Sequence, residues 1–96
     1  MSGEPHYPAM DTQIFNLSLS VPAISAYILI CSLVGDGTRP NWAVLRQAWV
    51  GPPEDLDPSM AELLAWQVID TISNAEGQEH FWPNPASLWR LPGTQN

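Results

Sequence analysis

Basic residues are scarce in this sequence. It has no lysine and three arginines, Arg39, Arg46 and Arg90, against ten acidic residues, which gives a formal net charge of -7. A protein that binds DNA by itself commonly neutralises several phosphates with Lys and Arg side chains. Three scattered arginines supply too few of these contacts. The charge therefore argues against independent DNA binding, unless dimerisation or a basic partner compensates for it.

Cysteine and long apolar runs are also scarce. Cys31 is the only cysteine, so an internal disulfide is impossible and a secreted disulfide scaffold is not expected. The mostly apolar stretch from Ala23 to Val34 is shorter than the roughly 20 residues that a membrane-spanning helix needs. Met1 to Gln13 contains no Lys or Arg, whereas a signal peptide has a basic start. These absences predict a cytoplasmic protein that does not enter a membrane.

The apolar and aromatic content indicates a folded domain. Hydrophobic residues make up 45% of the 96 residues, and five residues are tryptophan. So much apolar surface can offset the entropy of ordering, which a disordered acidic chain cannot do. At this length we expect one domain with one modest core. We place it at residues 14–92, with a mobile N-terminal arm at 1–13 and a flexible tail at 93–96.

The first predicted helix begins after Ser20 and ends at Gly35. The Ser20 hydroxyl is suited to cap the first turn, and Gly35 to take the left-handed conformation of a C-terminal cap. Helical spacing predicts one buried face, formed by Ile24, Tyr27, Ile28 and Cys31 and widened by Ile30, Leu33 and Val34. We interpret Cys31 as a packing residue. Before the helix, an imperfect alternation predicts a short extended segment from Ile14 to Leu19.

Two shorter helices follow. Asn41 is suited to cap the second helix, Gly51 and the two prolines after it end it, and its apolar stripe is Trp42, Leu45 and Trp49. Asp57 is predicted to cap the third helix, with Pro58 at the favoured first helical position. One face of this helix reads as core and contains Met60, Leu63, Leu64 and Val68.

A β-hairpin is predicted from about Ile69 to Trp82. The β-branched run that begins at Val68 predicts a strand, and Ser73 to Gln78 contains Asn74 and Gly77, which tolerate turn geometry. Pro83 and Pro85 end the return strand or confine it to an edge. After them, Ser87 to Leu91 is expected to fold back and place Trp89 on the core.

This order of elements resembles the winged helix-turn-helix family. The resemblance covers Val21 to Leu91: a helix, the Thr38–Pro40 segment where a first short strand would sit, two further helices, and the hairpin as the wing. It implies a small winged-helix-like α+β domain, three helices followed by a β-hairpin. In that family the third helix lies in the major groove, with base-contacting residues near its N-terminal end, and the wing often contacts phosphates.

The third helix departs from the family pattern in charge. Neither this helix nor the hairpin contains Arg or Lys. Its predicted exposed face is Ser59, Glu62, Ala65 and Trp66, and carboxylates at Glu54, Asp55 and Asp57 precede it. Such carboxylates repel a phosphate backbone within about one Debye length. A sequence-specific DNA-binding transcriptional regulator is therefore the alternative function, and binding to a protein is the first.

The acidic residues have two interpretations. They form a solvated surface that keeps the protein soluble, or a negative patch for a basic protein surface. The second predicts a partner-binding set that includes two exposed tryptophans, since tryptophan is enriched at interface hot spots: Glu54, Asp55, Asp57, Glu62, Trp66, Glu76 and Trp82, with Glu79 beside them. Small phage inhibitors of nucleic-acid-binding machines, including acidic anti-CRISPR proteins, are similar to this chain in size and charge.

The sequence offers little for catalysis. His6, His80 and Cys31 do not fall at metal-ligand or nucleophile–base spacings, and Gly35 to Gly37 reads as a turn, not as a phosphate loop. We therefore expect a non-enzymatic protein with no cofactor, no metal and no catalytic residue. The predicted function is binding of a macromolecule, first of all a protein, in a prokaryotic or phage transcription, replication or defence complex. A homodimer remains possible.

Overall fold

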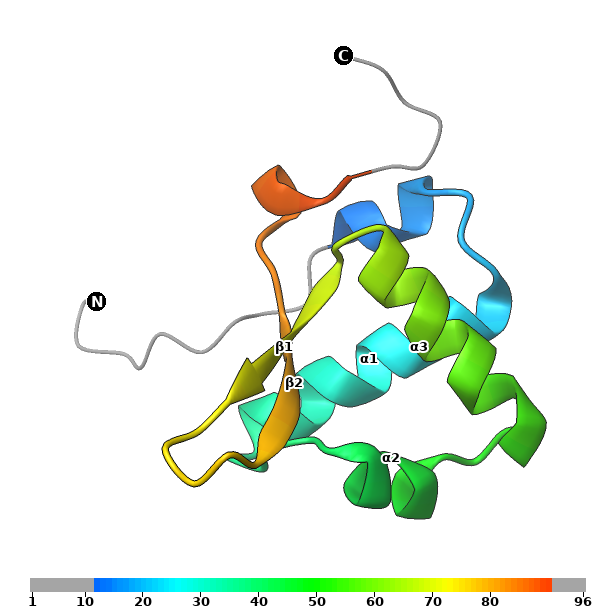
Figure 1. Cartoon of the computed structure of the whole chain (residues 1–96). Coiled ribbons are helices and arrows are strands. Elements are labelled where there is room, and N and C mark those ends of the chain that lie inside the picture. Colours follow the sequence, from blue (N-terminus) through cyan, green and yellow to red (C-terminus); the bar gives the residue numbers. More distant parts are fainter. Residues whose placement is uncertain (1–11, 91–96) are drawn as a thin grey trace.

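The computed structural model describes residues 12–90, so the predicted arm and tail lie outside it except for Thr12 and Gln13. Three helices come first, α1 (Val21–Gly35), α2 (Trp42–Ala48) and α3 (Leu56–Ala65), and a hairpin of β1 (Ile69–Ser73) and β2 (Glu79–Pro83) follows (Figure 1). Short 3-10 helices are η1 (Thr12–Asn16), η2 (Pro53–Asp55) and η3 (Ala86–Leu88). This is the predicted small α+β domain with a winged-helix-like layout.

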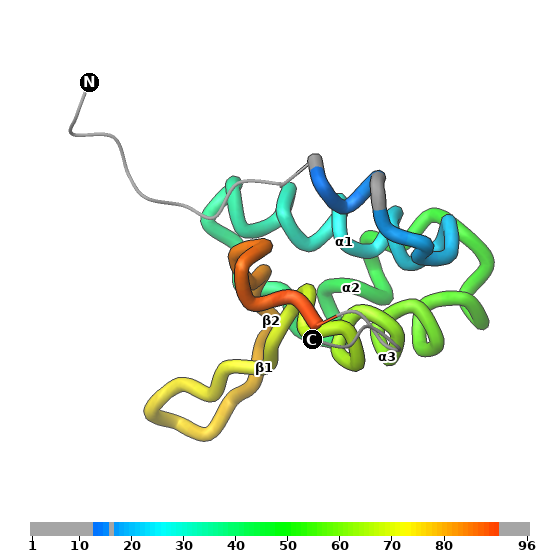
Figure 2. Tube along the Cα trace, turned by 90° about the horizontal axis from the view of Figure 1, so that it is seen from above, coloured from blue at the N-terminus to red at the C-terminus, as the bar shows by residue number. Residues whose placement is uncertain are grey.

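Helix α1 is central in the arrangement. It packs against α3, α2 and β2, and the far end of the hairpin projects away from the helices (Figure 2). The hairpin strands are antiparallel, with Thr71 opposite Phe81. The turn has the predicted chemistry: Gly77 has a φ of 81°, which glycine adopts at no steric cost. Asn74 Oδ1 accepts hydrogen bonds of 2.9 Å from the backbone N–H groups of Glu76 and Gln78.

The start of α1 is confirmed, and its end differs in one detail. Ser20 Oγ accepts a hydrogen bond from Ala23 N at 3.3 Å, and the helix ends at Gly35 as predicted. The left-handed residue is not Gly35, however, but Gly37, with a φ of 83°. The reversal occurs there because Asp36 and Gly37 still donate to carbonyls of the last turn, as an extension of the helix end.

The buried face of α1 is rotated from the predicted one. Its buried residues are Ala23, Ala26, Tyr27, Ile30, Cys31 and Val34, whereas Ile24 is half-buried and Ile28 is 40% exposed. The prediction for Ile28 was wrong because α1 has no charged residue, and only two serines, Ser25 and Ser32, mark its exposed face. Periodicity alone then does not determine which stripe faces the core.

Of the two caps predicted for α2 and α3, one is confirmed and the other is wrong. Asn41 Oδ1 accepts from Val44 N at 2.9 Å, as predicted. Asp57 does not cap α3, because η2 leads directly into the helix and places its first residue at Leu56. Asp57 therefore lies within the first turn. The buried Ser59 donates to the Asp55 carbonyl at 2.6 Å, so its predicted exposure was wrong.

Two segments expected to be extended are not strands. The stretch expected to be extended from Ile14 begins within η1, and Ile14 and Leu19 are both buried. At the position of the expected first strand, the Pro40 carbonyl accepts one hydrogen bond of 2.7 Å from Phe81 N. This bond attaches β2 to the helical part of the domain without forming a strand.

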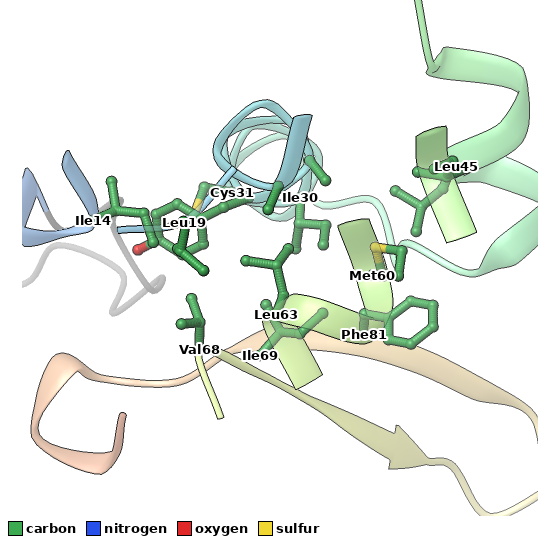
Figure 3. Packing of buried hydrophobic residues seen from close by; sticks show 14 of the residues in the cluster. Ile14, Leu19, Ile30, Cys31, Leu45, Met60, Leu63, Val68, Ile69 and Phe81 are labelled. Atoms are coloured by element: carbon green, nitrogen blue, oxygen red, sulfur yellow. The ribbon is translucent and has the colours of Figure 1, made fainter. Parts of the chain in front are cut away.

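One core joins all the main elements. Side chains from α1, α2, α3 and the hairpin meet in it, as Figure 3 shows for Ile30, Leu45, Met60, Leu63 and Phe81. Trp89 folds back against this core as predicted: its ring lies edge-on to Tyr27, with ring centroids 6.0 Å apart. The predicted core residues Ile24 and Leu64 pack at its margin.

Candidate functional site

Three of the predicted partner-binding residues lie in one short segment, which we call the acidic loop (Glu54, Asp55 and Asp57). Glu54 and Asp55 belong to η2, and Asp57 to the first turn of α3. Glu54 and Asp57 are exposed, and Asp55 is half-buried. Within residues 12–90 the single ion pair joins Asp57 to Arg46, with 3.8 Å between Oδ1 and Nη2. This exposed pair contributes little stability, and the loop retains a net negative charge.

Glu62 has a partner inside the protein. Its Oε2 accepts from Ser20 N at 3.0 Å and its Oε1 accepts from Ser20 Oγ at 2.8 Å. The carboxylate thus lies at the N-terminus of α1, where the helix dipole favours negative charge. The structure therefore places this predicted binding residue in a contact that joins α3 to α1.

The hairpin carries the remaining acidic residues in a separate place. Glu76 lies in the turn and Glu79 at the start of β2, and both are exposed. In both views the turn of the hairpin and the segment between α2 and α3 lie at opposite ends of the molecule (Figures 1 and 2). The single negative patch expected from the sequence is therefore two groups, because the hairpin projects away from the helices.

The five tryptophans differ less in solvent exposure than predicted. Trp66 and Trp82, expected to be exposed, are half-buried like Trp42, Trp49 and Trp89, and all five pack against the core. Trp82 also lies edge-on to His80 at 5.9 Å, and the Trp66 carbonyl accepts from Arg90 N. The most exposed large apolar side chains are instead aliphatic, above all Val21 and Val50, at 76% and 100%.

These two valines border a feature that the sequence reading missed, a groove of about 280 Å³ between the start of α1 and the segment that follows α2. We call it the α1–α2 groove. Its walls are mostly apolar and include Val21, Pro22, Leu29, Trp49, Val50 and Pro52. Asp55 of the acidic loop is the charged residue of the lining. The groove and the acidic loop therefore form one continuous surface.

The Trp49 side chain is fixed in the groove wall. Its indole Nε1 donates to the Pro52 carbonyl at 2.9 Å. Gly51 lies so close to the ring that a Cβ there would be 3.2 Å from Nε1. The sequence contained a signal for this surface, since Val50 is a large aliphatic residue directly before Gly51 and two prolines, where the chain leaves α2. By their composition, Gly51 and the two prolines predict only the end of a helix.

Within the described part of the chain, the reactive side chains form no metal-binding cluster. Cys31 is buried, and burial raises the pKa of its thiol while a hydrogen bond with the Tyr27 side chain acts in the opposite direction. A raised pKa lowers the thiolate fraction, so Cys31 is suited to packing. Among residues 12–90, no group of three or more His, Cys, Asp or Glu side chains is placed to hold a metal ion.

Two further observations bear on the class of protein. No helix in the described part of the chain is long and apolar enough to cross a membrane. Comparison of the chain with protein-family models, curated proteins and solved structures gives no match. The resemblance to winged-helix domains therefore rests on the order and layout of the elements alone.

Proposed function

We propose that this chain is a small, acidic, non-enzymatic protein that binds a partner protein carrying a basic surface. The observation that supports this proposal is the acidic loop, three carboxylates within four residues at the surface, of which Asp57 alone is paired with a cation. Charge of one sign on a protein surface steers association with a surface of the opposite sign and contributes to specificity.

The partner we propose belongs to a transcription, replication or defence complex of a prokaryote or its phage. Proteins of such complexes that bind nucleic acid present Lys and Arg to phosphates, and an acidic chain complements that surface. The role is that of a cytoplasmic regulator or inhibitor. The size and charge of this chain resemble those of acidic anti-CRISPR proteins.

The alternative, a sequence-specific DNA-binding regulator, is favoured by the winged-helix-like layout. Against it stand the residues of α3 that would face the DNA. Ser59 is buried and Glu62 is held by Ser20, so neither is available to a base. The end of α3 that would enter the major groove of DNA carries the acidic loop, which repels phosphate.

Affinity capture with charge-reversal variants tests the proposal. The tagged chain is used to capture proteins from cells that naturally produce it, beside a loop variant (E54K/D55K/D57K) and a hairpin variant (E76K/E79K). Circular dichroism first establishes that both variants are folded. We expect the chain to retain a protein with a basic surface, and the loop variant to lose it.

The hairpin variant is the matched control, because it reverses exposed charges far from the loop. Elution of the partner at moderate salt is also expected, since exposed charges are screened. Capture of nucleic acid alone, or of a protein that both variants retain at the wild-type level, would contradict a role for the acidic surface.

A further inference from the structure

The α1–α2 groove leaves aliphatic surface uncovered in the folded chain. Val50 is fully exposed and Val21 is 76% exposed, and both border the same groove, together with Leu29 of α1. Single exposed aliphatic residues are ordinary on a protein surface, but a contiguous apolar patch with a charged rim is typical of an interaction site. This groove has that arrangement.

The groove exists before any partner binds. The hydrogen bond from Trp49 to the Pro52 carbonyl and the contact of the ring with Gly51 hold one wall in place. A site that needs no rearrangement loses less conformational entropy when it is filled. Side chains that fill such preformed, desolvated pockets are the ones that contribute most to protein binding.

The size and chemistry of the groove select its occupant. Its volume of about 280 Å³ lies just below the range of small-molecule sites, which is about 300 to 1,000 Å³, and such sites add a few placed polar groups to a mostly apolar lining. Here Asp55 is the charged residue of the lining, with Glu54 next to it in η2. An apolar cavity of this size with a carboxylate at its rim fits a side chain of a protein better than a polar ligand.

We infer that the α1–α2 groove receives one aliphatic side chain of the partner protein, and that an Arg or Lys next to that side chain lies against Asp55 and Glu54. This inference rests on the proposed function and identifies the recognised segment. Charge argues against residues 1–13 as the occupant, because they contain no Lys or Arg. It also argues against two-fold pairing of this surface with a second copy, since that would bring two acidic loops together.

A display library of random peptides tests the inference, with the full chain as the target. We expect the selected peptides to share an aliphatic residue adjacent to Arg or Lys. The affinity of one such peptide, measured by fluorescence polarisation, should fall on the order of tenfold for V21S/V50S, because both substitutions remove apolar groove surface without changing charge. Asp55→Asn should weaken binding several-fold.

Both variants are expected to fold. Val21 and Val50 are exposed, and the Asp55 side chain makes no capping hydrogen bond within the described residues. Ile72→Ser is the matched control, since it removes an exposed aliphatic side chain from the hairpin, and it should leave the affinity unchanged.

The outcome also separates the inference from the proposed function. Selection of basic peptides without an aliphatic residue, or equal binding by V21S/V50S, would overturn the groove as the anchor site while leaving charge-based partner binding intact. Selection of no basic peptide would overturn both.

Discussion

Glu62 connects two helices that are far apart in the sequence. From α3 its carboxylate accepts two hydrogen bonds from Ser20, whose hydroxyl in turn accepts from Ala23 N. Free N–H groups at a helix N-terminus need acceptors, and a negative charge there is favourable. Within the chain, Glu62 therefore acts as a second cap for α1, supplied by tertiary structure.

Replacement of Glu62 tests this role. Glu62→Ala should lower the free energy of unfolding by about 1–2 kcal/mol, since it removes two hydrogen bonds and a charge near the helix N-terminus. Glu62→Gln should cost less, because the amide oxygen can still accept from Ser20 N. Urea unfolding followed by circular dichroism measures both. Glu79→Ala, at an exposed position on the hairpin, is the control, and equal effects of E62A and E79A would contradict the cap.

At the scale of elements, α1 is central and mostly apolar: it packs against α3, α2 and β2, and its polar residues, Ser25 and Ser32, are exposed. Its length and bounds follow from local signals, Ser20 at one end and Gly35 to Gly37 at the other. Its rotation does not. Ala23 and Ala26 face the core while Ile28 faces outward, and this choice depends on the shapes of α3 and the hairpin, which pack against it.

A pair of alanine substitutions tests the observed rotation. Leu63 of α3 is fully buried. Leu63→Ala should therefore lower the free energy of unfolding by about 2–5 kcal/mol, through lost burial and the cavity that remains. Ile28→Ala should cost less than about 1 kcal/mol, because the side chain is 40% exposed. Thermal melts of both variants give the comparison. A loss at Ile28 as large as that at Leu63 would mean that the predicted face of α1 was the buried one after all.

At the scale of the whole molecule, charge and layout point to different partners. The layout is winged-helix-like, and winged-helix proteins that bind DNA place the third helix in the major groove. The net charge of -7 repels the DNA backbone, and the acidic loop places carboxylates at the end of α3 that would approach it. We expect charge to outweigh layout, because phosphate contacts supply a large share of the affinity for DNA.

The whole-molecule charge predicts that the isolated protein does not select a DNA site. In a mobility-shift selection from random duplexes at physiological salt, we expect no reproducible enrichment. A winged-helix protein with a known operator serves as the positive control for the selection. Recovery of one sequence at nanomolar protein would favour the DNA-binding alternative over a protein partner.

The sequence by itself determined the features that act over a few residues. The caps at Ser20 and Asn41 and the turn at Asn74 and Gly77 follow from residues that satisfy nearby backbone groups or tolerate turn geometry. The break after α2 follows from Gly51 and the two prolines after it. The order of elements follows from the succession of these local signals, and the net charge follows directly from the composition. These features therefore predicted the α+β class, and the run of carboxylates at Glu54, Asp55 and Asp57 can be read directly from the sequence.

Only the tertiary structure decided which surfaces meet. The groove beside Val50, the bond from Ser20 to Glu62 and the separation of the hairpin acids from the acidic loop all join or divide residues that are distant in the chain. Hydrophobic burial is non-directional, so an apolar residue signals that it is to be covered without specifying by what. On a helix as apolar as α1, the covering elements determine which side chains become core and which remain as a binding surface.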